Sequence, residues 1–324
     1  MSPARAARRT VLTSAAAVVA GALLLTACGD DDGDDAAGQG SDSRQVTDAT
    51  GRKVDVPAAP KKVVTLSEPT LDAALALGVQ PVGATAGRGQ QGVSTYLADK
   101  AGKAEVVATV AEADMEKLAA LQPDLILLDE TTAVKGQVAK LESIAPTVVT
   151  AKLNEDWKKA FTATADALNR KAEADKLLAG FDSDVTATKG KLGKNAGAVV
   201  SVVRWQNKAP SVVGRGKNHV GSTLTALGLD RPAGQRGQGT GHSEPVSLEK
   251  LSTIDGDWLF FGTLGDRADG EKAYADARKV PNFGRLKAEQ EGHVEVVQGS
   301  AWNSAGGPLA ARIVLDDLTK ALAS

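Results

Sequence analysis

The chain has 324 residues, of which 24% are charged and 3% aromatic, and its formal net charge at pH 7 is −2. The first 43 residues contribute three positive and six negative charges, which leaves the remaining body with a net charge of +1. A nearly neutral body argues against a nucleic-acid partner, because nucleic acid favours a strong basic field. The body is long enough for two domains of ordinary size.

The N-terminus is predicted to direct export. Three Arg precede an uncharged run rich in Ala, Val and Leu, which predicts a secretory signal peptide over residues 1–27. Leu25-Thr26-Ala27-Cys28 matches the bacterial lipobox, so we expect lipidation at Cys28, the only Cys in the chain. Residues 28–45 predict an acidic, flexible tether. We therefore expect an extracytoplasmic protein held at the cell membrane by a lipid anchor. Arg8-Arg9 leaves the export route, general secretory or twin-arginine, open.

Residues 46–152 are predicted to form an N-terminal lobe in which strands and helices alternate. Such alternation predicts a parallel sheet with helices on both faces. The expected strands are residues 62–66, 81–84, 105–107, 124–128 and 147–150, and the expected helices are residues 71–77, 115–121 and 134–144.

A long amphipathic helix is predicted to bridge two lobes, within residues 153–193. Apolar side chains recur at helical spacing over residues 154–192, with charged residues between them. Asn154 is the expected N-cap, followed by acidic residues where the helix dipole favours them. Such a helix would be roughly 55 Å long. Gly180 is the expected weak point, so two consecutive helices are the alternative.

Residues 194–324 are predicted to form a C-terminal lobe that resembles the first one. The expected strands are residues 198–203, 211–213, 258–262 and 293–297, and a closing helix is expected over residues 308–322. Residues 115–128 and 248–261 share a pattern, as do residues 71–79 and 223–229, each of which closes a helix with Gly. The sequence therefore predicts an α/β fold with two Rossmann-like lobes, mainly parallel sheets and a ligand cleft between the lobes, beyond the carboxyl ends of the strands.

Motifs over nearly the whole body support a family resemblance. The chain resembles the lipoprotein substrate-binding components of iron–siderophore ABC importers, whose two lobes are joined by one helix. The motifs are Asp48-Ala49-Thr50-Gly51-Arg52 leading to Pro57 and Pro60, residues 75–83, residues 118–126, residues 143–148, Trp157, and Val202-Val203-Arg204. The resemblance implies an Fe(III)–siderophore ligand, a permease with a cytoplasmic ATPase as partner, and no cofactor. We expect the protein to be a monomer.

The resemblance also implies ligand-binding residues in the cleft. Arg204 stands where the family places its ligand-contacting arginine, and an arginine suits the task because it presents a charged fork of donors. Arg88, in a Gly-rich loop after a strand, is the corresponding candidate in the first lobe. A surface salt bridge is the alternative for Arg204. Trp205 and Trp302 are further candidates, with core packing as the alternative, and His242 is another, with a solvated loop position as the alternative. The remaining candidates are Asn303, Tyr96 and Arg215.

Two glutamates are predicted to dock on the permease. Glu116 and Glu249 hold equivalent places in the internal repeat, so related lobes would project them symmetrically. In the family that the chain resembles, the matching glutamates enter arginine pockets on the two permease subunits. The alternative is that each is an ordinary exposed helical Glu.

Other functions find less support. Gly87-Arg88-Gly89-Gln90-Gln91-Gly92 satisfies a dinucleotide-binding pattern, but no amphipathic helix is expected to open from it. The three His residues are scattered without metal-ligand spacing, which argues against a receptor for bare metal, so no direct metal ligand is predicted. Two alternatives remain: a receptor for cobalamin or haem on the same scaffold, and a secreted enzyme. The enzyme would need a nucleophile or carboxylate pair in the cleft, and the sequence indicates neither, so we predict a protein that is not an enzyme.

Overall fold

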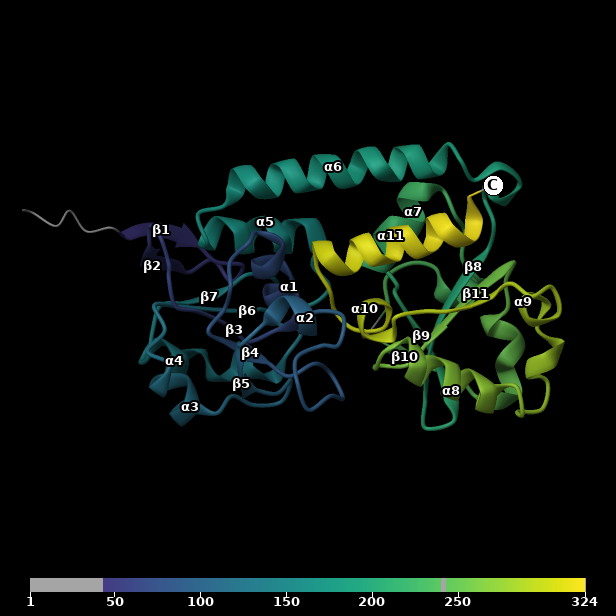
Figure 1. Ribbon diagram of the computed structural model, residues 1–324, viewed down its shortest axis with the longest axis horizontal. Coiled ribbons are helices and arrows are strands. Elements are labelled where there is room, and N and C mark those ends of the chain that lie inside the picture. The colour runs from purple at the N-terminus through teal and green to yellow at the C-terminus, as the bar shows by residue number, and fades with distance from the viewer. Residues whose placement is uncertain (1–42, 240–242, 324) are drawn as a thin grey trace, which may run out of the picture. The chain divides into compact units, whose positions relative to one another are not determined.

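The computed structural model describes residues 43–239 and 243–323, which contain two five-stranded sheets in one compact unit (Figure 1). Across these ranges, no helix is long and apolar enough to span a membrane. The predicted signal peptide, Cys28 and most of the predicted tether lie outside the described residues. The end of the predicted tether is wrong, because Ser43 already begins strand β1 (Ser43–Thr47).

The first sheet is parallel throughout and has the strand order β5-β4-β3-β6-β7. Its strands read as continuous apolar runs because helices cover both faces. The order reverses between β3 and β6, and α/β proteins bind ligands beyond the carboxyl ends of strands at such a reversal. In chain order the strands are β3 (Val63–Thr65), β4 (Gly83–Thr85), β5 (Glu105–Ala108), β6 (Leu125–Leu128) and β7 (Thr147–Val149).

Short helices connect these strands and, with the sheet, form the N-terminal lobe. They are α1 (Glu68–Ala76), α2 (Ala98–Ala101), α3 (Met115–Ala120), the 3₁₀ segment η1 (Ala133–Gln137) and α4 (Val138–Glu142). Ser67 and Thr70 form a capping box at the start of α1, and Gly78 takes a positive φ of 73° after its end. The predicted Gly closure of this helix is therefore confirmed.

An antiparallel hairpin that the sequence did not predict precedes the first sheet. It pairs β1 with β2 (Lys53–Pro57), and Val46 and Val56 pack into the core of the lobe. The turn is fixed by Asp48, whose Oδ1 accepts hydrogen bonds from the backbone N–H groups of Thr50 (2.9 Å) and Arg52 (3.0 Å). Burial alone would raise the pKa of Asp48, but the hydrogen bonds and charge of its partners outweigh burial and lower it.

The second sheet has the order β10-β9-β8-β11-β12 and is mainly parallel, as predicted. The exception is β9, which runs antiparallel to both of its neighbours. Asn207 and Lys208 connect β8 and β9 with positive φ values of 53° and 63°, as a tight two-residue hairpin requires. The strands are β8 (Val200–Gln206), β9 (Ala209–Val213), β10 (Ser243–Pro245), β11 (Trp258–Gly262) and β12 (Val294–Val296).

The helices of the C-terminal lobe include the closing helix α11 (Pro308–Leu322), whose predicted bounds are confirmed. The other helices are α7 (His219–Leu227), α8 (Arg267–Ala277), α9 (Lys287–Gln290) and α10 (Gly299–Trp302). Short 3₁₀ segments are η2 (Gly193–Asn195), η3 (Ala233–Gln235), η4 (Leu248–Ile254) and η5 (Phe283–Arg285).

The prediction of one continuous bridging helix is wrong. Two helices occupy this region, α5 (Trp157–Ala167) and α6 (Lys171–Lys189). They part at Asn169, which has a φ of 56° and donates a hydrogen bond to the carbonyl oxygen of Ala58. The two-helix alternative is therefore correct, but the break lies before Gly180, which continues α6. The N-cap is Asp156 rather than Asn154, because the Asp156 carboxylate accepts from the first free N–H groups of α5.

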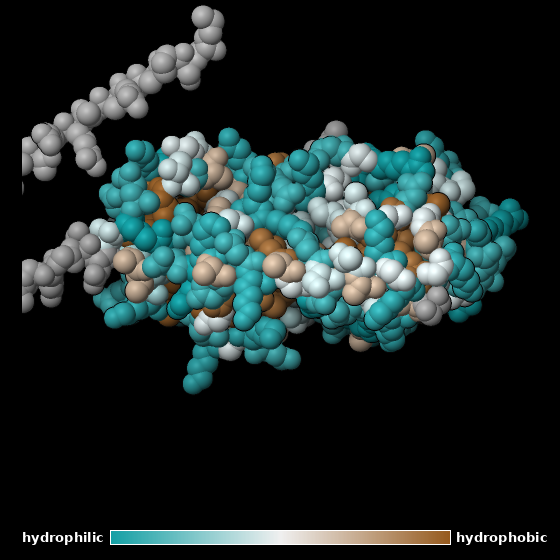
Figure 2. All heavy atoms as spheres, turned by 90° about the horizontal axis from the view of Figure 1, so that it is seen from above, coloured by the Kyte–Doolittle hydropathy of each residue, from teal (hydrophilic) through white to brown (hydrophobic). Residues whose placement is uncertain are grey.

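Helix α6 packs on the cores of both lobes and runs above both sheets in Figure 1. Ala174 near its start belongs to the core of the N-terminal lobe, whereas Phe181 and Val185 belong to that of the C-terminal lobe. Leu178 lies between them and contacts both cores. The face seen from above is largely hydrophilic, with small, separated hydrophobic patches (Figure 2). Helix α6 is thus a bridge of about 28 Å, half the predicted length.

Candidate functional site

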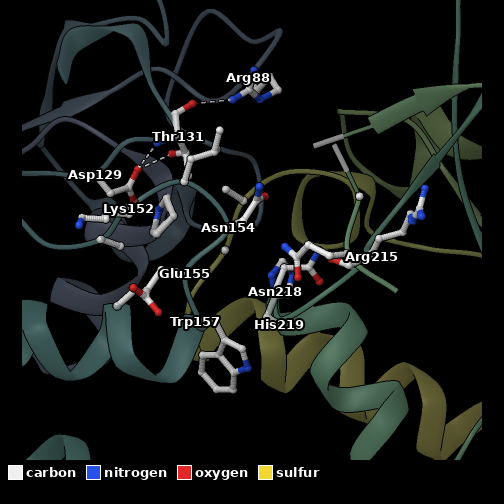
Figure 3. A pocket seen from close by; sticks show the side chains of 18 residues that line it. Arg88, Asp129, Thr131, Lys152, Asn154, Glu155, Trp157, Arg215, Asn218 and His219 are labelled. Carbon is white, nitrogen blue, oxygen red and sulfur yellow. Dashed lines mark hydrogen bonds between the residues drawn. The ribbon is translucent and has the colours of Figure 1, made fainter. Parts of the chain in front are cut away.

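A pocket of about 100 Å³ lies between the two lobes (Figure 3). Its walls come from loops that follow β4, β6, β7 and β9 and from the first turns of α5 and α7. Among its residues are the positively charged Arg88, Lys152 and Arg215, the acidic Asp129 and Glu155, the polar Thr131, Asn154, Asn218 and His219, and the aromatic Trp157.

Arg88 is the cation that the N-terminal lobe contributes after β4. Its Nη2 donates a hydrogen bond to the carbonyl oxygen of Thr131 at 3.2 Å (Figure 3). The preceding Gly87 permits this loop, since a Cβ there would lie 2.7 Å from the Cα of Ser94. Burial raises the pKa values of the carboxyl groups of Glu68 and Asp129, and the positive charge of Arg88 offsets part of this increase. The prediction of Arg88 at the cleft agrees with its position in the pocket wall.

Asp129 forms a fixed part of the wall that sequence reasoning missed. Its Oδ1 accepts from the backbone N–H of Thr131 at 2.8 Å, and its Oδ2 accepts from the hydroxyl of Ser67 at 2.9 Å. The Thr131 hydroxyl also donates to it. The available signal was its place in the chain, directly after Leu128 at the end of a predicted buried strand.

The segment between β7 and α5 forms a further wall that was not predicted. Asn154 adopts a φ of 65°, and Lys152 and Glu155 border the pocket beside it (Figure 3). Trp157 is 4% exposed and lines the pocket, while its ring makes an edge-to-face contact with Phe181 of α6, with centroids 5.4 Å apart. The bridge thus supports one apolar wall of the pocket.

Arg215 is the cation that the C-terminal lobe contributes to the pocket. Its Nη1 forms an ion pair with Glu244 at 2.5 Å, and its Nη2 donates to the carbonyl oxygen of Arg236 at 3.0 Å. Asn218 caps α7 and donates to the carbonyl oxygen of Arg215 at 2.8 Å. His219 is buried beside it, with Nε2 2.7 Å from the carbonyl oxygen of Ala301. Residues on α7 and its cap therefore fix the backbone that carries Arg215.

Arg204 lies within strand β8, not after it, because the strand extends to Gln206. It is 9% exposed and is not among the residues that line the pocket. Its Nη2 donates to the hydroxyl of Ser243 at 2.6 Å, and its Nη1 to the carbonyl oxygen of Asn303 at 3.4 Å. Burial, with the nearby charge of Arg88, lowers the pKa of Arg204. The two guanidinium groups, one from each lobe, are thus close enough to repel each other.

Neither of the two tryptophans predicted at the cleft lines the pocket, because both lie in the core. Trp205 belongs to β8, is 5% exposed and packs against Phe261 and Phe283. Trp302 belongs to α10, stacks on Phe260 at 4.7 Å and donates from Nε1 to Asp317 at 2.9 Å.

Three further predicted residues lie away from the pocket or outside the described residues. Tyr96 donates its hydroxyl to Asp72 at 2.9 Å, and Asn303 is buried and donates to the carbonyl oxygen of Thr263 at 2.9 Å. Neither lines the pocket, and contact with a ligand stays a prediction for both. His242 lies outside the described residues.

The two predicted docking glutamates are exposed, and each lies in the first turn of a short helix. Glu116 belongs to α3, which Asp114 caps, and Glu249 belongs to the 3₁₀ segment η4, which Ser247 caps. Helix α3 precedes β6 and segment η4 precedes β11. Strand β6 pairs with β3 and strand β11 pairs with β8, the central strands of the two sheets. The repeat is thus visible in the fold, and docking stays a prediction. Among residues 43–239 and 243–323, no cluster of three or more His, Cys, Asp or Glu side chains could hold a metal ion.

The two linked sheets and the pocket between them define a two-lobed α/β binding protein. Residues 63–300 match the family model for "Periplasmic binding protein", and that range is more than half of the chain. The chain therefore belongs to the periplasmic binding protein family.

Relatives with functional names support the same assignment. The chain is 32% identical over 287 residues to "Probable siderophore-binding lipoprotein YfiY" of Bacillus subtilis (strain 168), which covers 86% of this chain and 87% of that protein. It is 29% identical over 289 residues to "Petrobactin-binding protein YclQ" of the same organism, with 84% and 86% covered.

Solved structures share the fold. Staphylococcus aureus SirA complexed with staphyloferrin B superposes with a TM-score of 0.71 at 24% identity, covering 86% of this chain and 98% of that chain. Bacillus subtilis FeuA complexed with Ferri-Bacillibactin gives 0.71 at 23% identity, again covering 86% and 98%. At these identities the likeness shows the two-lobed fold alone.

Proposed function

We propose that this chain is the extracytoplasmic substrate-binding protein of an ABC importer and that it captures a ferric siderophore. The observation that carries the proposal is a pocket between two lobes to which each lobe contributes a cation, Arg88 from one and Arg215 from the other. The names of the relatives YfiY and YclQ point to the same class of ligand. Those names favour a siderophore over cobalamin or haem.

The chemistry of a ferric siderophore fits this lining. The iron is already surrounded by oxygen atoms of the carrier, so the protein needs donors to those oxygens rather than metal ligands of its own. Arg88 and Lys152 supply charged donors, Arg215 adds a cation that is paired with Glu244, and Trp157 supplies apolar surface for the organic part of the carrier. Arg204, whose pKa the charge of Arg88 helps to lower, adds to the positive potential that attracts anionic oxygens. The protein therefore binds its ligand without changing it chemically.

Delivery of the ligand requires a membrane partner. We infer that a lipid on Cys28 holds the protein at the membrane and that the monomer docks on the permease through Glu116 and Glu249. Both glutamates are exposed and occupy equivalent places in the two lobes, which supports a pseudo-symmetric docking face. A cytoplasmic ATPase would drive transport through that permease.

Native mass spectrometry against a panel of ferric siderophores, ferric citrate, haem and cobalamin tests the proposal. We expect one equivalent of a ferric siderophore to bind, and we expect Arg88→Ala to weaken binding by roughly tenfold or more, the effect of losing a charged group from the pocket wall. Arg312→Ala is the matched control, because Arg312 pairs with Asp184 and does not line the pocket.

The outcomes of this panel are distinct. Binding of haem or cobalamin with no siderophore would replace the proposed ligand by the alternative one. Full siderophore affinity in Arg88→Ala would keep the function and remove Arg88 from the site.

A further inference from the structure

Two buried carboxylates on α1 reach across to the C-terminal lobe, and neither lines the pocket. Glu68 and Asp72 are 3% and 0% exposed and lie one helical turn apart on the same side of α1. Both accept hydrogen bonds from residues 304–310, the segment that leads into α11. We call these two residues the α1 clamp.

Asp72 caps helix α11, whose own N-cap residue has no side chain to do so. Its Oδ1 accepts from the N–H of Leu309 at 2.8 Å, and its Oδ2 accepts from the N–H groups of Gly307 (3.0 Å) and Ala310 (2.9 Å). The N-cap position of α11 is Gly307, which has no side chain to satisfy these donors. A carboxylate at this end also complements the dipole of a 15-residue helix. The first turn of α11 therefore depends on a residue of the N-terminal lobe.

Two glycines allow the close approach that this cap needs. A Cβ on Gly307 would lie 2.8 Å from Oδ1 of Asp72, and a Cβ on Gly306 would lie 2.5 Å from the Cβ of Ala310. Gly306 and its neighbour Ala305 line the pocket. The α1 clamp thus fixes a stretch of pocket wall directly.

The clamp continues into a second contact between the lobes. Tyr96 donates its hydroxyl to Oδ2 of Asp72 at 2.9 Å, and its backbone N–H donates to the hydroxyl of Ser300 at 3.3 Å. The hydroxyls of Thr95 and Ser300 lie 2.8 Å apart. Ser304 donates a hydrogen bond to Glu68 and so belongs to the same set of contacts between the lobes. Asp72 therefore holds the N-terminus of α11 and, through Tyr96, the loop that follows Arg88 in the opposite wall.

We propose that Asp72 is a positioning residue that sets the spacing of the two lobes across the pocket. Helix α6 joins the lobes on the outside and the α1 clamp joins them on the inside, so the clamp adds to the bridge in restricting their relative motion. The lobes pivot about the clamped contact between α1 and α11 rather than separating there. Because the hydrogen bonds of Asp72 are all internal to the protein, this role does not depend on the identity of the ligand.

Pulsed electron paramagnetic resonance on the full chain measures this spacing. Spin labels are placed on Lys140→Cys in α4 and Lys250→Cys in η4, exposed sites on the two lobes, after replacement of Cys28 by Ser. Asp72→Asn replaces one acceptor oxygen by an NH₂ group that faces backbone N–H donors. We expect a broader distance distribution that extends to longer distances.

Hydrogen exchange on the same proteins supplies the local readout. We expect the amides of residues 304–310 to exchange roughly tenfold faster or more in Asp72→Asn, as the loss of a buried charged acceptor predicts. The matched control is Asp266→Asn, because Asp266 caps α8 by accepting from Asp269 within the C-terminal lobe. That control should leave the distance distribution and the exchange of residues 304–310 unchanged.

Two results would overturn the proposal. One is a wild-type distance distribution in Asp72→Asn, and the other is the same broadening in Asp266→Asn. Should Asp72→Asn fail to fold, Gly307→Ala supplies the test with the same expected and opposing results, because its added methyl group must push the Asp72 carboxylate away from α11.

Discussion

Removal of the Phe181 ring should destabilise the protein strongly, because α6 is anchored through it. Phe181 is 6% exposed in the core of the C-terminal lobe and meets Trp157 edge to face at an interplanar angle of 85°. Truncation of a buried Phe to Ala typically costs about 3–5 kcal/mol, and the edge-to-face contact accounts for about 0.5–1.5 kcal/mol of that loss. We therefore expect Phe181→Ala to lower the free energy of unfolding by about 3–5 kcal/mol.

Urea unfolding followed by circular dichroism measures this loss, with Leu177→Ala as the matched control. Leu177 lies on the same helix but is 41% exposed, so its truncation should change the free energy of unfolding by no more than about 0.5 kcal/mol. A loss below about 1 kcal/mol for Phe181→Ala, or equal losses for the two variants, would show that α6 does not bury this face against the C-terminal lobe.

Three further predictions concern the hairpin turn, the helix break and the core. The pKa of Asp48 is lowered in the folded protein. Its ionised carboxylate therefore stabilises the fold at pH values above the unfolded pKa of about 3.9, and this stabilisation is lost as pH falls through the folded pKa. Asp48→Asn should therefore cost about 1.5–3 kcal/mol at pH 7 in urea unfolding, with a smaller difference near pH 3, and a difference independent of pH would contradict this. Asn169→Val should lower the midpoint of thermal unfolding more than Asn169→Gly, because both variants lose the hydrogen bond to Ala58 but only Val resists the positive φ; equal midpoints would refute that reason. Trp302→Phe should cost about 1 kcal/mol through the lost bond to Asp317 but leave siderophore affinity intact, and weakened binding would return Trp302 to the site.

The sheets were largely predictable because buried parallel strands are continuous apolar runs. All five strands of the first sheet and α11 lie where periodicity predicted them. The hairpin β1–β2 was not predicted because the motif that begins at Asp48 served only as support for the family resemblance. Its Asp, Thr and Gly residues also favour a turn. The helix break was misplaced because Asn169 adopts a left-handed conformation that sequence periodicity does not reveal.

The candidate site was only partly predictable. Arg88 was predicted because it follows a strand that ends at the pocket, whereas Arg215 was a weaker candidate without that reason, and both line the pocket. Trp205 was misassigned because β8 continues beyond its apolar run as far as the hairpin at Asn207. Asp129 and the segment that contains Asn154 reach the pocket only through the packing of the two lobes, which no local pattern in the sequence specifies.

The most direct measurement of the central claim is the affinity of two single variants, Arg88→Ala and Arg215→Ala, for the ferric siderophore that binds most tightly in the panel. The two arginines belong to different lobes and line the same pocket. If the ligand is held between the lobes, calorimetric titration should show that each variant weakens binding by roughly 10- to 100-fold, the loss of one charged contact. Unchanged affinity in either variant would contradict a ligand held between the two lobes.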